Sequence, residues 1–571
     1  MVTTNEDIIE SQNICENFLS AVADSKESTA IRVPQPDGTL ETVSYTELAD
    51  RVARAVTGLA THGVTQGDYV LLMMTNRIEF HIADLACLFL RATPVSVYNS
   101  SSVDQVVQII SQTRAKVAIV EDQFGPTIVE ARQQSATLSS IVSVGESFEG
   151  SDGGFDELVG STAADLEELA AQVEGSDIAT VIFTSGTTGE SKGVVLDHDN
   201  LTWTVACLRR TLNLDTYKGQ RLISYLPMAH VAERTVSHYT GLISGFDITC
   251  CPEPTQVAEF AKTVRPTILF GVPRVYEKIY NKVLANLCGE NPTTVSKLVG
   301  AVKFKLFKKK ILDKVGLNEL VVAASGGAAL SPTVMEWFTE LGLPISEIYG
   351  LSETCGPLAW APFDAKVGRV GPACPGVEMR LAEDGEIQCR GGNVFRGYLN
   401  RQDLTDQVLD ARGWFSTGDI GVVDGNGSLK VIDRKKEILV TSGGKNVSPT
   451  ALENALKLIP VVSQAAVVGD GRKFVSSLVT LDPDAAHSWC EANGIKVNSM
   501  AEVASSPEFN EALDTQVETA MGQFSHAEQV KKVHLLDHDW EPDTACLTAT
   551  SKLRRRVIEK TYASEIEAMY S

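Results

Sequence analysis

Residues 184–193 read Thr184-Ser185-Gly186-Thr187-Thr188-Gly189-Glu190-Ser191-Lys192-Gly193, and this stretch decides the fold. An apolar run precedes it and Val194-Val195-Leu196 follows it, which predicts a turn between two buried strands. Glycines let backbone N–H groups face an anion, hydroxyls add donors, and lysine adds a positive charge. A flexible hairpin turn is the simpler interpretation of a glycine-rich loop. The density of donors beside a lysine favours a loop that binds phosphates.

Two common nucleotide-binding motifs do not match this stretch. A Walker A loop requires Gly-x-x-x-x-Gly-Lys-Ser/Thr, whereas Lys192 is preceded by Ser191 and followed by Gly193. The Gly-x-Gly-x-x-Gly pattern of dinucleotide-binding folds is not matched either. The loop is therefore not a Walker A loop, and a dinucleotide-binding fold is not supported.

Composition sets the broad class of the protein. A chain of 571 residues is too long for one core, so we expect at least two domains. Its net charge of −23 argues against a general nucleic-acid-binding protein, because a phosphate backbone would be repelled. The 11 cysteines lack a Cys-x-x-Cys pair and are interpreted as reduced thiols. With no signal peptide and no apolar stretch that could span a bilayer, we expect a cytoplasmic protein.

Predicted strands and helices alternate through residues 1–175, which indicates a mostly parallel sheet in an α/β fold. The expected helices are 45–61 and 79–90, and the expected strands are 70–74, 117–120 and 141–144. An acidic, glycine-rich run at 146–160 is interpreted as a surface loop.

The pattern changes after residue 366. Glycine, proline and short alternating runs at about 367–433 predict an antiparallel, β-rich subdomain. Strands and helices alternate again over 437–571, which we expect to form a small α+β domain. The charged block 433–437 between them is a candidate hinge, although it also fits a solvated turn.

Several side chains stand at the ends of predicted strands, where α/β sheets bind ligands. His230 follows the strand at 221–225, although a lone histidine is more often structural. Tyr349 and Glu353 share a tight turn, where the ring suits a purine and the carboxylate suits Mg²⁺. Asp419 suits a ribose diol. Residues 297–314 carry seven lysines and one aspartate, which fits a solvated helix face or a patch that contacts anionic membrane lipids.

Together, and in this order, these pieces resemble the adenylate-forming superfamily, and most closely its long-chain fatty acid–CoA ligases. The resemblance covers nearly the whole chain and rests on Thr-Ser-Gly-Thr-Thr-Gly-x-x-Lys-Gly at 184–193, Tyr-Gly-x-x-Glu-Thr at 349–354 and Ser-Thr-Gly-Asp at 416–419. It implies a large N-terminal domain (1–433) of stacked α/β sheets with the β-rich subdomain, a hinge at 434–436, and a mobile C-terminal domain (437–571).

The resemblance also implies roles for single residues. The residues that hold the ATP phosphates would be Thr184, Ser185, Gly186, Thr187, Thr188, Gly189 and Lys192. The rest of the nucleotide site would be Gly327, Ala328 and Tyr349 around adenine, Asp419 and Arg434 on ribose, and Gly350 and Thr354 beside them. The catalytic residues would be Lys552, Glu353, Thr184 and His230, with Thr184 and Glu353 holding Mg²⁺. Lys436 would be the hinge, and the residues on the coenzyme A side would be Ser442, Gly443, Gly444 and Lys445.

The implied substrates are ATP, a long-chain fatty acid and coenzyme A, with Mg²⁺ as cofactor. Two alternatives share the adenylation motifs: a fatty acyl-AMP ligase that loads a carrier protein, and a catalytically silent protein that binds acyl groups or nucleotides. Such acyl-AMP ligases typically contain an extra insertion, and no obvious one is seen. The chain departs from the family at Ala549, where proline is frequent, and at Lys436, where other branches have aspartate.

Overall fold

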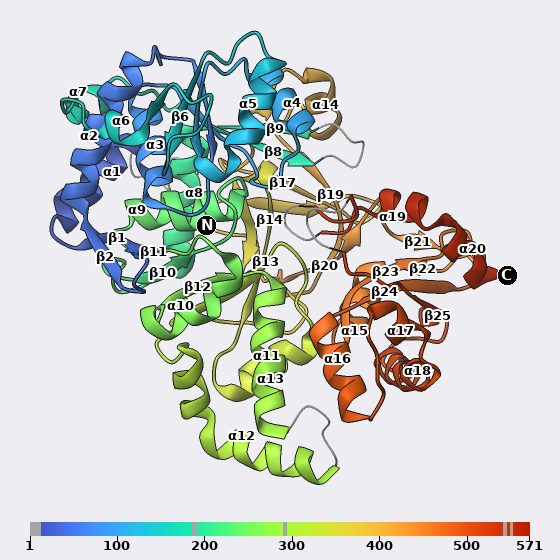
Figure 1. Cartoon of the computed structure of the whole chain (residues 1–571). Coiled ribbons are helices and arrows are strands. Elements are labelled where there is room, and N and C mark those ends of the chain that lie inside the picture. Colours follow the sequence, from blue (N-terminus) through green and yellow to red (C-terminus); the bar gives the residue numbers. More distant parts are fainter. Residues whose placement is uncertain (1–12, 186–190, 289–293, 541–544, 549–551) are drawn as a thin grey trace.

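The computed structural model describes residues 13–185, 191–288, 294–540, 545–548 and 552–571. A large N-terminal domain and a smaller C-terminal domain lie side by side in Figure 1. Both combine helices and sheets, so the expected α/β class, with a β-rich subdomain and a small second domain, is confirmed.

A five-stranded parallel sheet forms one layer of the N-terminal domain. Its strands, in spatial order, are β4 (Thr93–Ser96), β3 (Tyr69–Met73), β5 (Val117–Glu121), β6 (Ser140–Val144) and β7 (Gly153–Gly154). All neighbouring strands are parallel, as the alternating pattern predicted. The helices in this part of the chain are α1 (Ile14–Ser25), α2 (Tyr45–Thr61), α3 (Ile78–Phe89), α4 (Val103–Thr113), α5 (Gly125–Gln133), α6 (Phe155–Val159) and α7 (Leu166–Ala170). Capping boxes at Ser44 and Ser102 fix where α2 and α4 begin.

The prediction of a loop over 146–160 was partly wrong. Residues 153–154 add the edge strand β7, and Phe155–Val159 form α6. Phe155 and Leu158 are buried, because α6 packs on α2 where Gly58 leaves room for the backbone of Leu158. Two apolar residues three apart were too weak a signal beside so many acids and glycines.

Three further sheets complete the core of the N-terminal domain. One has the order β10 (Arg221–Ser224), β11 (Asp247–Cys250), β1 (Thr29–Pro34), β2 (Leu40–Ser44), with β1 and β2 antiparallel. The second has the order β12 (Ile268–Gly271), β13 (Val322–Gly326), β14 (Ser346–Leu351), β15 (Gly356–Trp360). The third has the order β18 (Gly397–Tyr398), β9 (Ser191–Asp197), β8 (Ile178–Ser185). The helices among these strands are α8 (His198–Leu212), α9 (Gly241–Ile243), α10 (Val257–Val264), α13 (Pro332–Leu341) and α14 (Gln402–Val408).

A buried charge network joins α3 to a π-helix, Glu233–Thr240. Asp84 is 0% exposed and Arg234 is 1% exposed, and their side chains form an ion pair. The other oxygen of Asp84 accepts a hydrogen bond from Tyr239 (3.1 Å) and lies 2.8 Å from Nε2 of His238. Burial disfavours ionisation of Asp84, but Arg234, His238 and the hydrogen bond from Tyr239 together outweigh it and lower the pKa of the carboxyl.

The β-rich subdomain is a four-stranded antiparallel sheet, as predicted. Its spatial order is β16 (Glu378–Leu381), β17 (Glu386–Arg390), β19 (Phe415–Val423), β20 (Leu429–Arg434). Opposite strands place Asp419 directly across from Arg434.

The C-terminal domain has apolar cores of its own. Strands β23 (Val462–Val468), β24 (Val475–Leu481) and β25 (Val530–Leu535) form its sheet, and β21 (Leu439–Val440) pairs with β22 (Asn446–Val447). All seven residues of β24 are buried, because helices cover the sheet on both faces. Those helices are α15 (Pro449–Leu456), α16 (Pro483–Ala492), α17 (Met500–Ser505), α18 (Pro507–Met521), α19 (Arg555–Thr561) and α20 (Ala563–Tyr570).

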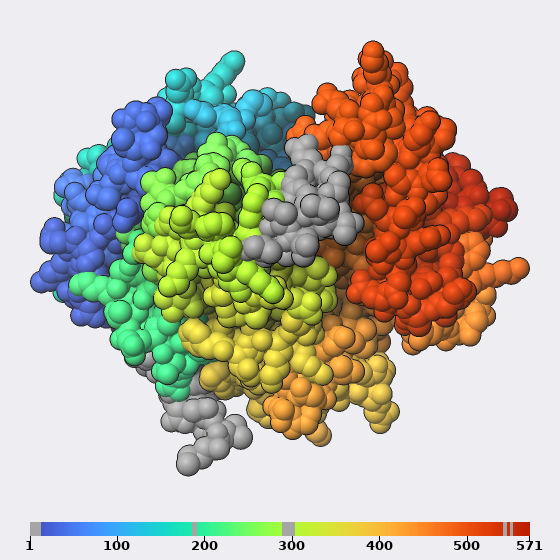
Figure 2. All heavy atoms as spheres, turned by 90° about the horizontal axis from the view of Figure 1, so that it is seen from below, coloured from blue at the N-terminus to red at the C-terminus, as the bar shows by residue number. Residues whose placement is uncertain are grey.

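Two long helices extend from the N-terminal domain at the lower edge of Figure 1. They are α11 (Pro273–Cys288) and α12 (Thr294–Val315), and α12 is kinked at Phe307. Figure 2 views this yellow-green end of the molecule with the orange-red C-terminal domain beside it. In the part of the chain that the structure covers, no helix combines the length and apolar character needed to cross a bilayer.

We predict that Asp84→Asn lowers the free energy of unfolding by about 3–5 kcal/mol, because it leaves the Arg234 guanidinium buried without a counter-charge. Urea denaturation of the purified protein measures the loss. The matched control is Asp50→Asn, whose carboxylate is 53% exposed in an i,i+4 pair with Arg54 and should cost no more than about 0.5 kcal/mol. Equal losses in the two variants would contradict the assignment.

Candidate active site

The predicted phosphate loop connects β8 to β9, which pair antiparallel with Thr184 opposite Lys192. Residues 186–190 lie outside the described residues, and so do the predicted roles of Gly186, Thr187, Thr188 and Gly189. The Thr184 hydroxyl donates to the Lys192 carbonyl at 3.5 Å, which leaves its oxygen lone pairs available. Phosphate-binding candidates at both ends of the loop are therefore held side by side by the strand pairing.

The two residues predicted for ribose meet Tyr349. Its hydroxyl donates to Oδ2 of Asp419 at 2.6 Å, and Nε of Arg434 lies 2.8 Å from Oδ1. Burial raises the pKa of Asp419, although Arg434 opposes that shift. Burial and the adjacent Asp419 raise the pKa of Tyr349 well above its usual value, so its hydroxyl stays protonated and can donate.

The predicted adenine contacts follow β13 and β14. Gly327 has φ +82°, which suits glycine, and it is exposed like Ala328. A Cβ at Gly350 would lie 1.7 Å from the carbonyl oxygen of Gly356, so only glycine fits where these backbones meet. The Thr354 hydroxyl is buried and donates to the Gly356 carbonyl at 2.7 Å. That hydroxyl therefore holds the turn together.

Glu353 and Thr184 are the residues predicted to hold a metal. The hydroxyl of Tyr398 donates to Oε1 of Glu353 at 2.8 Å, which occupies one of the two carboxylate oxygens. The remaining oxygen and the Thr184 hydroxyl are hard donors of the kind that Mg²⁺ prefers, so these residues fit that ion. No cluster of three or more His, Cys, Asp or Glu side chains suited to a metal occurs among the described residues.

Lys552 comes to this site from the C-terminal domain. A short hairpin presents it, in which Leu547 pairs with Leu553 and the backbone N–H of Lys552 donates to the Thr548 hydroxyl at 3.0 Å. Lys552 keeps contact with solvent, but protein surrounds it on several sides. Desolvation of the ammonium and the charge of Arg434 lower the pKa of Lys552, while Asp419, Glu437 and Glu353 oppose the shift. The structure thus brings Lys552 near the Asp419–Arg434 pair.

His230 lies within electrostatic range of Lys552. Burial, and then the charge of Lys552, lower the pKa of His230 to about 3, so the ring is neutral near pH 7. Its Nδ1 accepts a hydrogen bond from the backbone N–H of Ala232 at 3.2 Å. The ring proton is consequently on Nε2, which makes that atom a donor. His198 differs, because its Nδ1 accepts a hydrogen bond from the backbone N–H of Ile14 at 3.2 Å.

The predicted hinge lies beside a set of contacts between the domains. Asp433, at the end of β20, accepts from the hydroxyls of Ser448 (2.6 Å) and Thr450 (3.0 Å) at the start of α15. Lys435, next to Lys436, pairs with Asp384 (2.5 Å) and Glu386 (2.9 Å) of the β-rich subdomain. These contacts fix the chain on both sides of Lys436.

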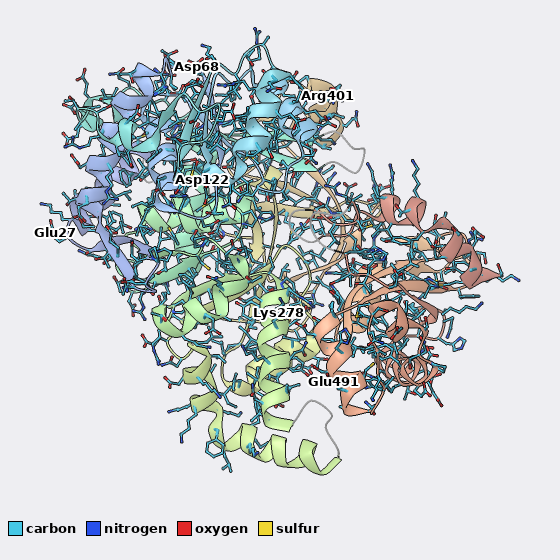
Figure 3. The ribbon with its side chains drawn as sticks, in the orientation of Figure 1. Glu27, Asp68, Asp122, Lys278, Arg401 and Glu491 are labelled. Atoms are coloured by element: carbon cyan, nitrogen blue, oxygen red, sulfur yellow. The ribbon has the colours of Figure 1, made fainter. Side chains whose placement is uncertain are left out.

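Two further contacts cross the boundary away from the hinge. The side-chain amide of Asn454 donates to the carbonyl of Ala329 at 3.0 Å, and Arg274 lies 3.8 Å from Asp482. In Figure 3, Lys278 of α11 and Glu491 of α16 mark the two sides of this boundary. The orientation that brings Lys552 to the site is therefore held at several separate points.

The residues predicted for the coenzyme A side lie together in the turn between β21 and β22. Ser442, Gly443, Gly444 and Lys445 are exposed or near the surface, and the backbone of Ser442 donates to the Arg472 carbonyl at 2.8 Å. Lys445 lies 3.3 Å from Glu528.

The sequence analysis missed several residues of this site. Tyr398 and Asn454 contact predicted site residues or hold the domain that carries one, and Asp433, predicted only as part of the hinge block, binds the start of α15. Tyr398 follows Gly397 in β18, which pairs with β9, and that dipeptide alone predicts no role. Each of these contacts joins residues remote in sequence, so no local pattern could reveal them.

Comparisons with known proteins agree on the kind of fold. The AMP-binding enzyme family matches residues 18–399, and the AMP-binding enzyme C-terminal domain matches residues 436–571. A long-chain-fatty-acid–CoA ligase of Mycobacterium tuberculosis is 35% identical, over 94% of this chain and 93% of that protein. A long-chain-fatty-acid–CoA ligase of Xenopus laevis is 29% identical, over 92% of this chain and 80% of that protein.

Solved structures show the same architecture. The adenylation domain of a carboxylate reductase from Mycobacterium chelonae superposes with a TM-score of 0.80 at 20% identity, covering 98% of this chain and 91% of that chain. The corresponding domain of a carboxylic acid reductase from Segniliparus rugosus, in complex with AMP and a co-purified carboxylic acid, gives 0.78 at 21%, covering 98% and 94%. At these identities the likeness concerns the fold alone.

Proposed function

This chain belongs to the family of AMP-binding enzymes, and we propose from that premise that it converts long-chain fatty acids to acyl-CoA. The reaction would pass through an acyl-adenylate and release AMP and pyrophosphate. The observation that carries the proposal is the convergence of Lys552, from the C-terminal domain, on Asp419, Arg434 and Glu353 of the N-terminal domain. The 35% identity to a long-chain-fatty-acid–CoA ligase over nearly the full length supports the choice of substrate.

The first half-reaction joins two anions. A carboxylate oxygen forms a bond to the α-phosphorus of ATP while the bond to the pyrophosphate oxygen breaks. Two unit charges ~4 Å apart repel by ~4 kcal/mol at an effective dielectric near 20. Lys552 would offset this repulsion and stabilise charge on the transferring phosphoryl group. Tyr349, Asp419 and Arg434 would hold the nucleoside so that the α-phosphate faces that lysine.

Other groups in the site would orient the fatty acid and bind the ATP phosphates. Neutral His230 would donate from Nε2 to the fatty acid carboxylate, which orients it without a proton transfer. Glu353 and Thr184 would hold Mg²⁺, which supplies positive charge to the phosphates when bound. Lys192 and the loop hydroxyls would bind the pyrophosphate portion.

In the second half-reaction the C-terminal domain would present a different surface to the acyl-adenylate. The thiol of coenzyme A attacks the acyl carbonyl, the bond from that carbon to the AMP oxygen breaks, and the thiol proton leaves to solvent. Lys552 is not required for this step. Rotation about Lys436 would withdraw it and present residues 442–445 to the site.

The direct test follows thiol loss and pyrophosphate release with ATP and Mg²⁺ over fatty acids from acetate to C20. We predict that both occur and that activity is greatest with long chains. Pyrophosphate release without thiol loss would contradict the proposal and indicate an acyl-AMP ligase that loads a carrier protein. Neither product would indicate a silent binding protein.

Lys552→Ala should slow acyl-adenylate formation by roughly 10²–10³-fold, because it removes the cation at the transferring phosphoryl group. It should leave thioester formation from supplied acyl-adenylate within about twofold of the wild-type rate. Quenched-flow measurement of each half-reaction separates the two steps. Lys560→Ala, on α19 of the same domain, is the control and should change neither. Equal loss in both half-reactions would refute the two-orientation mechanism.

We also propose that this cytoplasmic enzyme contacts membranes through the exposed face of α12. One side of that helix packs Phe304 and Ile311 into the core. The other side presents Leu306 (72% exposed) and Phe307 (44% exposed). Exposed lysines flank this pair at 303, 305, 309 and 310. Exposed apolar side chains among lysines, on a chain of net charge −23, fit an anionic lipid surface that also holds the fatty acid.

Replacing the four flanking lysines by glutamine should weaken binding to phosphatidylglycerol vesicles at least tenfold, because each lysine near an anionic surface contributes roughly 1 kcal/mol. Vesicle co-sedimentation at low salt measures this, and phosphatidylcholine vesicles should bind neither form. A control variant changes four exposed lysines elsewhere to glutamine, namely Lys430, Lys496, Lys531 and Lys560. If the two variants bind anionic vesicles equally, α12 is not the contact surface.

A further inference from the structure

Tyr398 lies between two separate parts of the candidate active site. It belongs to β18, which pairs with β9 so that Tyr398 is opposite Val194, two residues after Lys192. The ammonium of Lys192 lies 5.1 Å from the centre of the Tyr398 ring. The hydroxyl at the other end of the ring donates to Oε1 of Glu353 at 2.8 Å. One side chain thus contacts both the phosphate-loop lysine and the carboxylate suited to a metal.

The surroundings of Tyr398 keep this ring in place. Its backbone N–H donates to the hydroxyl of Thr405 on α14 at 2.9 Å. Phe395 packs edge-on against it with the ring centres 4.9 Å apart. The ring is 9% exposed, and a Cβ at the preceding Gly397 would lie 2.9 Å from Thr405. Backbone pairing, packing and a hydrogen bond therefore determine where the hydroxyl points.

The two contacts of Tyr398 differ in chemistry. The hydroxyl can only donate to Glu353, because burial and that carboxylate raise the pKa of the phenol far above neutral pH. Its donation engages Oε1 of the carboxylate and leaves the second oxygen without a bond from this tyrosine. The ring face carries partial negative charge and attracts the Lys192 ammonium without neutralising it. Lys192 is thereby held in position while its charge stays available for a phosphate.

We propose that Tyr398 is a positioning residue that sets Glu353 and Lys192 together, so that the metal-bound and lysine-bound parts of the ATP phosphates are aligned. This inference rests on the proposed function. It assigns to one aromatic side chain the coupling between Lys192 on β9 and Glu353 in the turn at 349–354. Tyr398 itself would not touch the reacting atoms.

The test measures equilibrium binding of ATP without fatty acid, so that no turnover occurs, as a function of Mg²⁺ concentration. Tyr398→Phe keeps the ring and removes the hydroxyl. It should leave metal-free ATP binding unchanged and reduce the gain in affinity from Mg²⁺ roughly tenfold, as expected for loss of a hydrogen bond to a charged group. Tyr398→Leu also removes the ring and should weaken metal-free binding about threefold or more.

Two controls make the outcome specific. Tyr570→Phe removes a hydroxyl that donates to the Val468 carbonyl in the C-terminal domain, and it should change neither affinity. The double variant Tyr398→Phe, Glu353→Gln should show the same gain in ATP affinity from Mg²⁺ as Glu353→Gln alone, because the tyrosine acts through that carboxylate. Thermal unfolding of each variant reports whether it folds.

Unchanged Mg²⁺ dependence in Tyr398→Phe would overturn this inference and leave the proposed function intact. Equal weakening of metal-free and metal-dependent binding would also overturn it, because that result indicates a general structural role. Failure of the wild-type chain to bind ATP at all would instead refute the proposed function, and this inference with it.

Discussion

The structure depends on the placement of one positive charge that belongs to a different domain from the nucleotide site. A carboxylate and a triphosphate repel each other at reacting distance, and a cation between them must be present for one step only. In the proposed reaction, Lys552 of the C-terminal domain would be that cation. Its charge lies within electrostatic range of Asp419, Arg434 and Glu353 of the N-terminal domain and helps to lower the pKa of His230.

Contacts away from the chemistry make that placement specific. Asp433 binds the start of α15 through two hydroxyls, Asn454 donates to the backbone beside the predicted adenine loop, and Arg274 lies near Asp482. Asp433 is buried and makes two such bonds, whereas the Asn454 and Arg274 contacts are single, in part exposed to water, and contribute modestly. Contacts of that size can hold one orientation and still be exchanged for another, which a two-step reaction requires.

The N-terminal domain, by contrast, is held together by extensive buried contacts. The Asp84–Arg234 pair is sealed inside it, and the parallel sheet is covered on both faces. The site residues are attached to this frame through strand pairing, as in the opposition of Thr184 to Lys192 and of Asp419 to Arg434. The proposed nucleotide site and Lys552 thus belong to two domains with separate apolar cores.

How far the sequence could predict this arrangement depended on the range of each interaction. Apolar runs located β8 and β9, and the family resemblance implied ribose roles for Asp419 and Arg434, which the structure shows as a cross-strand pair. The role of Tyr398 could not be predicted, because its partners are about 45 and 200 residues away and only the folded sheet brings them together. The short helix α6 was missed for a related reason, since its burial depends on a gap left by Gly58.

The central claim is that the orientation seen here serves adenylation and must change before thioester formation. It can be tested by locking the domains with a disulfide or a short bifunctional thiol reagent between Ala329→Cys and Asn454→Cys, whose parent residues are in contact. We predict that the locked protein releases one equivalent of pyrophosphate, retains acyl-adenylate and makes no acyl-CoA until the link is cleaved. Undiminished acyl-CoA formation by fully locked protein would contradict the account.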